Sequence, residues 1–125
     1  EVDMKAIFPL WKRDTKELMN EFLDSGFKTT IVCAQSHIHE FVGRVIDKQL
    51  ITELPDEIDV CGENGEFHTF AFDGPIFKEP VLFTNGEKVF KELIKPKNEK
   101  DTCFSSNTSH PEKLGYWYID LVPTY

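Results

Sequence analysis

Residues 14–34, which read DTKELMNEFLDSGFKTTIVCA, predict a helix that leads directly into a buried strand. Asp14 is a favoured helix N-cap, and Glu17 follows three residues later as its capping-box partner. Gly26 is placed to end the helix in the left-handed conformation. β-Branched residues then dominate the stretch from Phe27 to Ala34, as expected of a strand. The apolar stripe of the helix is formed by Leu18, Met19, Phe22 and Leu23.

A second apolar run precedes this helix and completes a larger unit. Residues 6–8, within Met4–Pro9, predict a short strand that ends at the proline. Strand, helix and strand in succession are typical of a βαβ unit with parallel strands. The sequence therefore predicts an α/β fold that begins as a mostly parallel sheet, with functional groups beyond its carboxyl ends, at Pro9–Arg13 and Cys33–His39.

The second half of the chain favours antiparallel strands. Helices are expected over Ser36–Arg44 and Asp47–Leu54, and a polar loop over Lys95–Pro111. Alternation over Glu66–Phe72 predicts a strand that carries Glu66, His68, Phe70 and Phe72 on one face. Asn85-Gly86 predicts a hairpin turn between two short strands, Val81–Thr84 and Lys88–Leu93, and Tyr116–Val122 predicts the last strand.

Composition restricts the class of protein. A chain of 125 residues is expected to form one domain, residues 1–125. Its net charge of -8 argues against nucleic acid or an anionic membrane as the main partner. The sequence shows no apolar run of the roughly 20 residues that a membrane span needs and no CxxC pair among its 3 cysteines, and we expect no signal peptide. A reducing, cytoplasmic location is therefore expected.

The chemistry-bearing residues concentrate in residues 59–75, which read DVCGENGEFHTFAFDGP. Gly62 and Gly65 bracket Glu63 and Asn64, and glycine permits sharp turns and close approach of a ligand. Glu66 and His68 then follow with the spacing of one strand face, so carboxylates and an imidazole suited to acid–base chemistry leave one turn. The alternatives are a hairpin turn with solvated acids, a half-buried histidine and a small buried cysteine at Cys61.

Several segments follow one another in an order that resembles a known family. They are PLW at 9–11, Gly26, Gly43-Arg44 with Asp47, DVCGENGEFHTF at 59–70 and DGPIF at 73–77. Together they resemble the carboxy-terminal half of the diphthine–ammonia ligase family, a branch of the N-type (PP-loop) ATP pyrophosphatases. The resemblance implies an enzyme that activates a carboxylate as an acyl-adenylate and then forms an amide with ammonia. In the named members the carboxylate is diphthine, a modified histidine of translation elongation factor two.

The resemblance also implies partners and cofactors. The family's Ser-Gly-Gly-Lys-Asp-Ser type of phosphate-binding loop belongs to an amino-terminal, adenine nucleotide alpha hydrolase-like half, and none of the 7 glycines here forms such a loop. ATP and Mg²⁺ are therefore expected to bind mainly to that other half. The chain is expected to be the substrate-facing half, inactive alone, with the PP-loop half and a protein substrate as partners; a homodimer stays open.

Roles follow for individual residues. Glu66 and His68 are expected to handle the ammonia proton, and the third catalytic candidate, Glu63, is expected to act with Asn64 in holding the substrate or a metal-bound phosphate. Trp11 and Phe70 would shape the pocket, and no metal ligands are assigned. The substrate-binding set is Trp11, Cys61, Gly62, Asn64, Gly65, Thr69 and Asp73.

Two other functions stay open at this point. One is a non-catalytic module that docks a protein partner, and the other is a metal-dependent hydrolase built on Glu63, Glu66 and His68. Tightly bound zinc would favour the hydrolase, whereas ATP turnover that requires the PP-loop half would favour the ligase.

Overall fold

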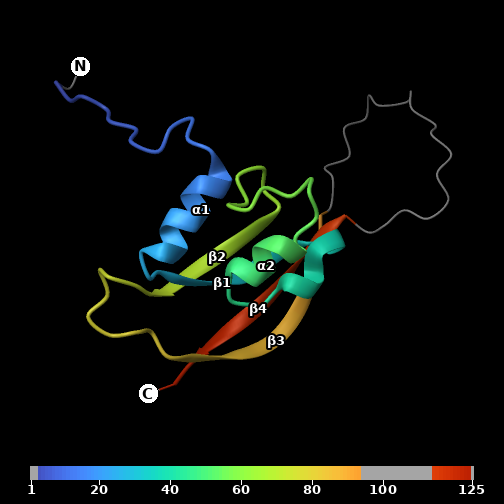
Figure 1. Ribbon diagram of the computed structural model, residues 1–125. Coiled ribbons are helices and arrows are strands. Elements are labelled where there is room, and N and C mark those ends of the chain that lie inside the picture. The colour runs from blue at the N-terminus through green and yellow to red at the C-terminus, as the bar shows by residue number, and fades with distance from the viewer. Residues whose placement is uncertain (1–2, 94–113, 125) are drawn as a thin grey trace, which may run out of the picture.

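The computed structural model of the protein describes residues 3–93 and 114–124. Its centre is a four-stranded sheet in the order β2-β1-β4-β3, in which every neighbouring pair is antiparallel (Figure 1). The strands are β1 (Lys28–Gln35), β2 (Phe67–Asp73), β3 (Phe83–Glu92) and β4 (Gly115–Pro123). The helices are α1 (Thr15–Asp24), the short 3-10 helix η1 (Ser36–Phe41) and α2 (Lys48–Glu53). The α/β class is therefore confirmed.

The expected parallel start is wrong, because Met4–Pro9 forms no strand. Figure 1 shows this amino-terminal segment, in blue, running away from the sheet, and Ile7 is 78% exposed. Both edges of β1 are already taken: β2 pairs along one edge, while β4 and a bridge from Thr30 to Val45 occupy the other. A further strand has no free edge of β1 on which to pair, and Pro9 lacks the N–H that a central strand would need.

The local signals around α1 and β1 are confirmed. The Asp14 side chain accepts a hydrogen bond from the Glu17 N–H at 2.9 Å, and Gly26 has φ +86° directly after the helix. At α2, the Asp47 side chain accepts from the Leu50 N–H at 2.7 Å. The helix expected over Ser36–Arg44 is shorter and tighter, since η1 ends at Phe41 and is kinked at Ile38.

The predicted hairpin at Asn85-Gly86 is wrong. β3 runs continuously from Phe83 to Glu92 and pairs with β4, with a register shift between Asn85 and Lys88. The two residues therefore form an irregularity inside one strand, and the Asn85 amide donates to the Gly43 carbonyl at 3.0 Å. The last strand is confirmed as β4, and the loop predicted over Lys95–Pro111 lies outside the described residues.

The buried core joins the helices to the sheet. Helix α1 lies above β1 and β2 in Figure 1, and Met19 from α1 packs in the same cluster as Leu50 from α2. The other members include Ile31, Ile38, Phe41, Ile58, Phe67 and Ile119. Within the described ranges, no helix is long and apolar enough to cross a membrane. This core fixes α1 against the sheet and so sets the position of the loop that follows α2.

Candidate functional site

The loop of residues 59–66, between α2 and β2, folds around the carboxylate of Glu66. This side chain is buried, with an exposed fraction of 6%. It accepts hydrogen bonds from the Asp59 N–H at 3.1 Å, from the Asn64 N–H at 2.9 Å and from the Asn64 side-chain amide at 3.0 Å. One carboxylate therefore closes the loop on itself by satisfying donors from both of its ends.

The surroundings of Glu66 set the protonation of its carboxylate. Burial acts to raise the pKa, but the hydrogen bonds from Asp59 and Asn64 outweigh it, and the pKa of Glu66 is lowered. An ionised carboxylate that is fully engaged by the loop suits a structural anchor better than a group that exchanges protons. Sequence alternation predicted the wrong surroundings, because it takes no account of backbone donors brought together by a loop.

The expected pairing of Glu66 with His68 on one strand face is also wrong. Glu66 precedes β2, which begins at Phe67, and is buried in the loop. His68 is exposed, and it alternates along β2 with Phe67 and Thr69, which line the pocket described below. His68 therefore lies on the opposite face of the sheet.

The two glycines of the loop are required by its backbone. Gly62 has φ +69° and Gly65 has φ +83°. A Cβ at position 62 would lie 2.7 Å from the Phe67 carbonyl oxygen, whereas a Cβ at position 65 would meet nothing within 4 Å. The Gly65 carbonyl accepts from the Gln35 side-chain amide at 3.0 Å and from the Tyr116 hydroxyl at 3.1 Å, so the loop is also bound to β1 and β4.

We expect Gly62→Ala to lower the free energy of unfolding by about 3 kcal/mol, because left-handed strain adds to overpacking against a backbone oxygen. Gly65→Ala is the matched control: its φ is also positive but its Cβ is unobstructed, so about 1–2 kcal/mol is expected. Urea denaturation of both variants measures the difference. Equal losses would show that the contact with Phe67 is relieved by a small shift and does not constrain the loop.

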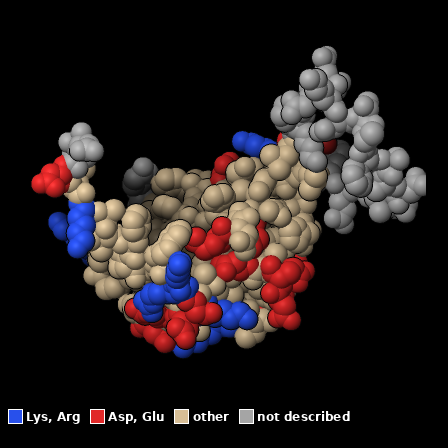
Figure 2. Space-filling model, turned by 90° about the horizontal axis from the view of Figure 1, so that it is seen from above, with Lys and Arg blue, Asp and Glu red and all other residues tan. Residues whose placement is uncertain are grey.

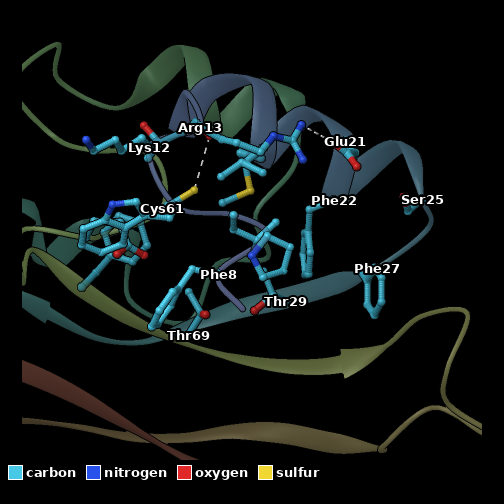
Figure 3. A pocket seen from close by; sticks show the side chains of 18 of the residues that line it. Phe8, Lys12, Arg13, Glu21, Phe22, Ser25, Phe27, Thr29, Cys61 and Thr69 are labelled. Atoms are coloured by element: carbon cyan, nitrogen blue, oxygen red, sulfur yellow. Dashed lines mark hydrogen bonds and ion pairs between the residues drawn. The ribbon is translucent and has the colours of Figure 1, made fainter. Parts of the chain in front are cut away.

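Asp59 attaches the loop to the start of α1. The Thr15 hydroxyl donates to one carboxylate oxygen at 2.7 Å, and the Cys61 N–H donates to the other at 2.8 Å. The Cys61 thiol in turn donates to the Thr15 carbonyl at 3.4 Å, as drawn in Figure 3. Sequence reasoning missed Thr15 and the role of Asp59, although Asp59 two residues before Cys61 fits an Asx-turn.

A pocket of about 890 Å³ lies between residues 7–13, helix α1 and the neighbouring face of β1 and β2 (Figure 3). Four predicted site residues line it together: Trp11, Cys61, Glu63 and Thr69. The loop residues Gly62, Asn64, Gly65 and Glu66 are absent from its lining. Sequence reasoning missed lining residues whose only signal was an apolar or β-branched pattern, among them Phe22, Phe27 and Thr29.

Asp73 and Phe70, two further predicted residues, also lie outside the pocket lining. Asp73, at the last position of β2, accepts from the Lys28 ammonium at 2.7 Å and from the Gly74 N–H at 2.8 Å. The hydrogen bond from Lys28 lowers the pKa of Asp73. Phe70 packs edge-on against Phe83, with ring centroids 6.0 Å apart. Asp73 thus fastens the end of the β1–β2 pair, and Phe70 does not shape the pocket.

The thiol of Cys61 is held in its neutral form. Burial, and then the charges of Asp59, Glu63 and Asp14, raise the pKa of Cys61 to about 11. A neutral thiol that donates to a backbone carbonyl is a poor nucleophile at neutral pH. Across residues 3–93 and 114–124, no group of three His, Cys, Asp or Glu side chains could hold a metal ion.

We expect Cys61 to react with iodoacetamide about a hundredfold more slowly at pH 7 than a thiol whose pKa is near 9, since the thiolate fraction falls tenfold for each pKa unit. The rate should rise with pH up to about pH 11. The measurement uses a Cys33→Ser, Cys103→Ser background so that Cys61 is the thiol followed. Rapid alkylation at pH 7 would contradict the neutral thiol.

Comparison with known proteins identifies the family to which this domain belongs. Residues 14–98 match the diphthamide synthase C-terminal domain. The chain is a member of the diphthamide synthase C-terminal domain family, which confirms the resemblance.

Curated relatives are similar over most of the chain. It is 29% identical over 95 residues to the diphthine–ammonia ligase of Danio rerio, covering 70% of this chain and 37% of that protein. It is 26% identical over 95 residues to the human diphthine–ammonia ligase, covering 70% of this chain and 36% of that protein. It is 27% identical over 92 residues to the diphthine–ammonia ligase of Schizosaccharomyces pombe, and the match covers 69% of this chain and 15% of that protein. The chain thus spans between 15% and 37% of the lengths of these relatives.

Proposed function

We propose that this domain is the substrate-facing part of an ATP-dependent ligase that converts a carboxylate into an amide, as diphthine–ammonia ligases are named for doing. One observation carries the proposal most directly. Cys61, Glu63 and Thr69, all from the DVCGENGEFHTF segment at 59–70 that resembles the family, line one pocket together with Trp11. The domain would act with a PP-loop half that binds ATP and Mg²⁺, because residues 1–125 contain no phosphate-binding glycine loop of that type.

The geometry favours Glu63 as the group that handles the ammonia proton. Glu63 is exposed and lines the pocket, whereas the Glu66 carboxylate is engaged by Asp59 and Asn64. In the proposed reaction ammonia attacks the acyl-adenylate carbonyl, the bond to AMP breaks, and Glu63 accepts the proton that nitrogen loses. Glu66 is then a positioning residue that holds the loop carrying Glu63, and His68 has no place in this pocket.

A second candidate function, docking of a protein partner, is favoured by the amino-terminal segment. Ile7, Phe8, Leu10 and Trp11 are between 60% and 78% exposed. Figure 2 shows uncharged surface between the charged tip of this segment and the body of the molecule. We propose that the PP-loop half covers this surface, so that docking and catalysis are two aspects of one assembly.

The test measures pyrophosphate release from ATP. The chain alone is expected to release none above background. The chain combined with a PP-loop half, a diphthine-bearing acceptor and ammonia is expected to release pyrophosphate in proportion to the acceptor. Release by the chain alone would contradict the proposal, and so would a complete mixture whose release does not depend on the acceptor. Stable assembly without any ATP turnover would favour the docking function.

A further inference from the structure

The outer edge of β3 has no strand beside it in the described part of the chain. β3 is the last strand in the order β2-β1-β4-β3, and only its inner edge is paired, with β4 (Figure 1). After the register shift between Asn85 and Lys88, residues 88–92 pair regularly with residues 115–119. A regular strand whose outer N–H and C=O groups are unpaired can accept a further strand.

The side chains along this edge have opposite charges at the two ends and apolar groups between them. Val89 is 41% exposed although it is apolar. Phe90 is half-buried, and its ring centroid lies 5.5 Å from that of Trp117. Lys88 and Glu92 are exposed, and neither forms an ion pair within the described residues. The edge therefore carries two charges that the fold itself leaves unpaired.

We infer that a second copy of this chain pairs with this edge, antiparallel and across a two-fold axis, with Phe90 opposite Phe90 of the second copy. In this register, Lys88 lies opposite Glu92 of the second copy, and by symmetry Glu92 lies opposite Lys88. Opposite charges that face each other across antiparallel strands are stabilising, and so are aromatic pairs. The edge is thus complementary to itself in charge and carries an apolar centre on the symmetry axis.

The neighbouring registers are less favourable. A shift of one residue places Lys88 opposite Lys91 of the second copy, and like charges directly opposite each other are destabilising. A shift of two residues centres the pair on Val89 and brings Glu87 into the ladder, but Glu87 lies within the register shift, where regular pairing is interrupted. Lysine on an edge strand usually opposes pairing with another chain, whereas in the register centred on Phe90 the charge of Lys88 is neutralised.

The position of β3 keeps this interface apart from the pocket. β3 and β2 are the two outer strands of the sheet, and Phe67 and Thr69 of β2 line the pocket. Pairing through β3 would join two four-stranded sheets into one continuous sheet and leave the pocket of each copy uncovered. This self-association requires neither ATP nor a PP-loop half, so it goes beyond the proposed function.

The test measures the monomer–dimer equilibrium of the 125-residue chain by sedimentation velocity over a range of concentrations at low salt. The wild type is expected to dimerise reversibly. Lys88→Glu and Glu92→Lys are each expected to raise the dimer Kd about tenfold, because each reversal makes a pair of symmetry-related contacts repulsive. The double variant restores opposite charges and is expected to return to near the wild-type Kd. Lys16→Glu, an exposed lysine of α1 with the same change in net charge, is the matched control.

Amide hydrogen exchange supplies a second, independent readout. Alternate amides within residues 88–92 are expected to exchange more slowly as the concentration of the chain rises, because their outward N–H groups become hydrogen-bonded in the dimer. A chain that stays monomeric up to about 1 mM would overturn the inference. So would a double variant that dimerises no better than the single variants, or a Lys16→Glu control that is weakened as much as Lys88→Glu. Since no ATP, PP-loop half or substrate is present, these outcomes are distinct from failure of the proposed ligase reaction.

Discussion

Replacing Glu66 by glutamine is expected to lower the free energy of unfolding by about 3–5 kcal/mol at pH 7, because charge-assisted hydrogen bonds to buried donors are lost. Three donors converge on this carboxylate: the Asp59 N–H, the Asn64 N–H and the Asn64 side-chain amide. Glutamine keeps the shape, but its amide group presents N–H where one of these donors needs an acceptor. The loop of residues 59–66 would therefore loosen although the side-chain volume is unchanged.

The pH dependence of that loss follows from the lowered pKa of Glu66. A carboxylate with a depressed pKa in the folded state contributes its full stability above the unfolded value, about pH 4.3, and loses it as pH falls through the folded value. The difference in the free energy of unfolding between wild type and Glu66→Gln should therefore be constant from pH 7 to about pH 5 and shrink below that. Urea denaturation across this range measures it, with Glu57→Gln as an exposed control. A loss below about 1 kcal/mol, or one that grows on acidification, would contradict the anchoring role.

The second large effect is expected on catalysis. In the assembled ligase, Glu63→Gln should lower kcat by about 10²–10⁴-fold, the usual contribution of an acid–base group. Glu63 lines the pocket and is exposed, so stability should change by no more than about 0.5 kcal/mol. A loss of rate without a loss of stability identifies a group that handles a proton. Glu66, in contrast, is expected to support the fold, so its replacement should lower stability.

Glu57→Gln is the matched control for the catalytic effect. Glu57 is an exposed glutamate close in sequence to the loop, but it does not line the pocket. Steady-state assays at saturating ammonia should show near-wild-type turnover for this variant. Similar rates for Glu57→Gln and Glu63→Gln would remove Glu63 from the mechanism. Partial rescue of Glu63→Gln at higher pH would support proton acceptance, since hydroxide can then accept the proton that the attacking nitrogen loses.

The sequence was informative at the helix ends, where structure depends on neighbouring residues. Asp14 and Asp47 cap their helices, and Gly26 follows α1 in the left-handed conformation, because a cap requires only a side-chain oxygen or a permissive backbone within a few residues. The pocket residues Trp11, Cys61, Glu63 and Thr69 were also predicted, although from resemblance rather than from spacing. The resemblance therefore selected residues that share one pocket, which periodicity did not do.

Features that depend on distant partners were not predictable from patterns. The run at residues 6–8 is as apolar as a strand, but the edges of β1 are occupied by segments from much later in the chain. Asn85-Gly86 is a favoured turn, but pairing along the whole of β4 keeps β3 continuous. Glu66 was expected to lie on the same strand face as His68. Instead it precedes β2, and the donors that hold its carboxylate come from Asp59 and Asn64 in the loop.

We propose that this domain receives the carboxylate that the assembled ligase converts into an amide. The most direct measurement incubates a polypeptide carrying this domain and a PP-loop half with ATP, isotope-labelled ammonia and elongation factor two that bears diphthine. Mass spectrometry then locates the label. We expect labelled amide on the modified histidine, in amounts that match the AMP formed and that fall strongly with Glu63→Gln. AMP formation without labelled amide, or equal labelling by the PP-loop half alone, would contradict it.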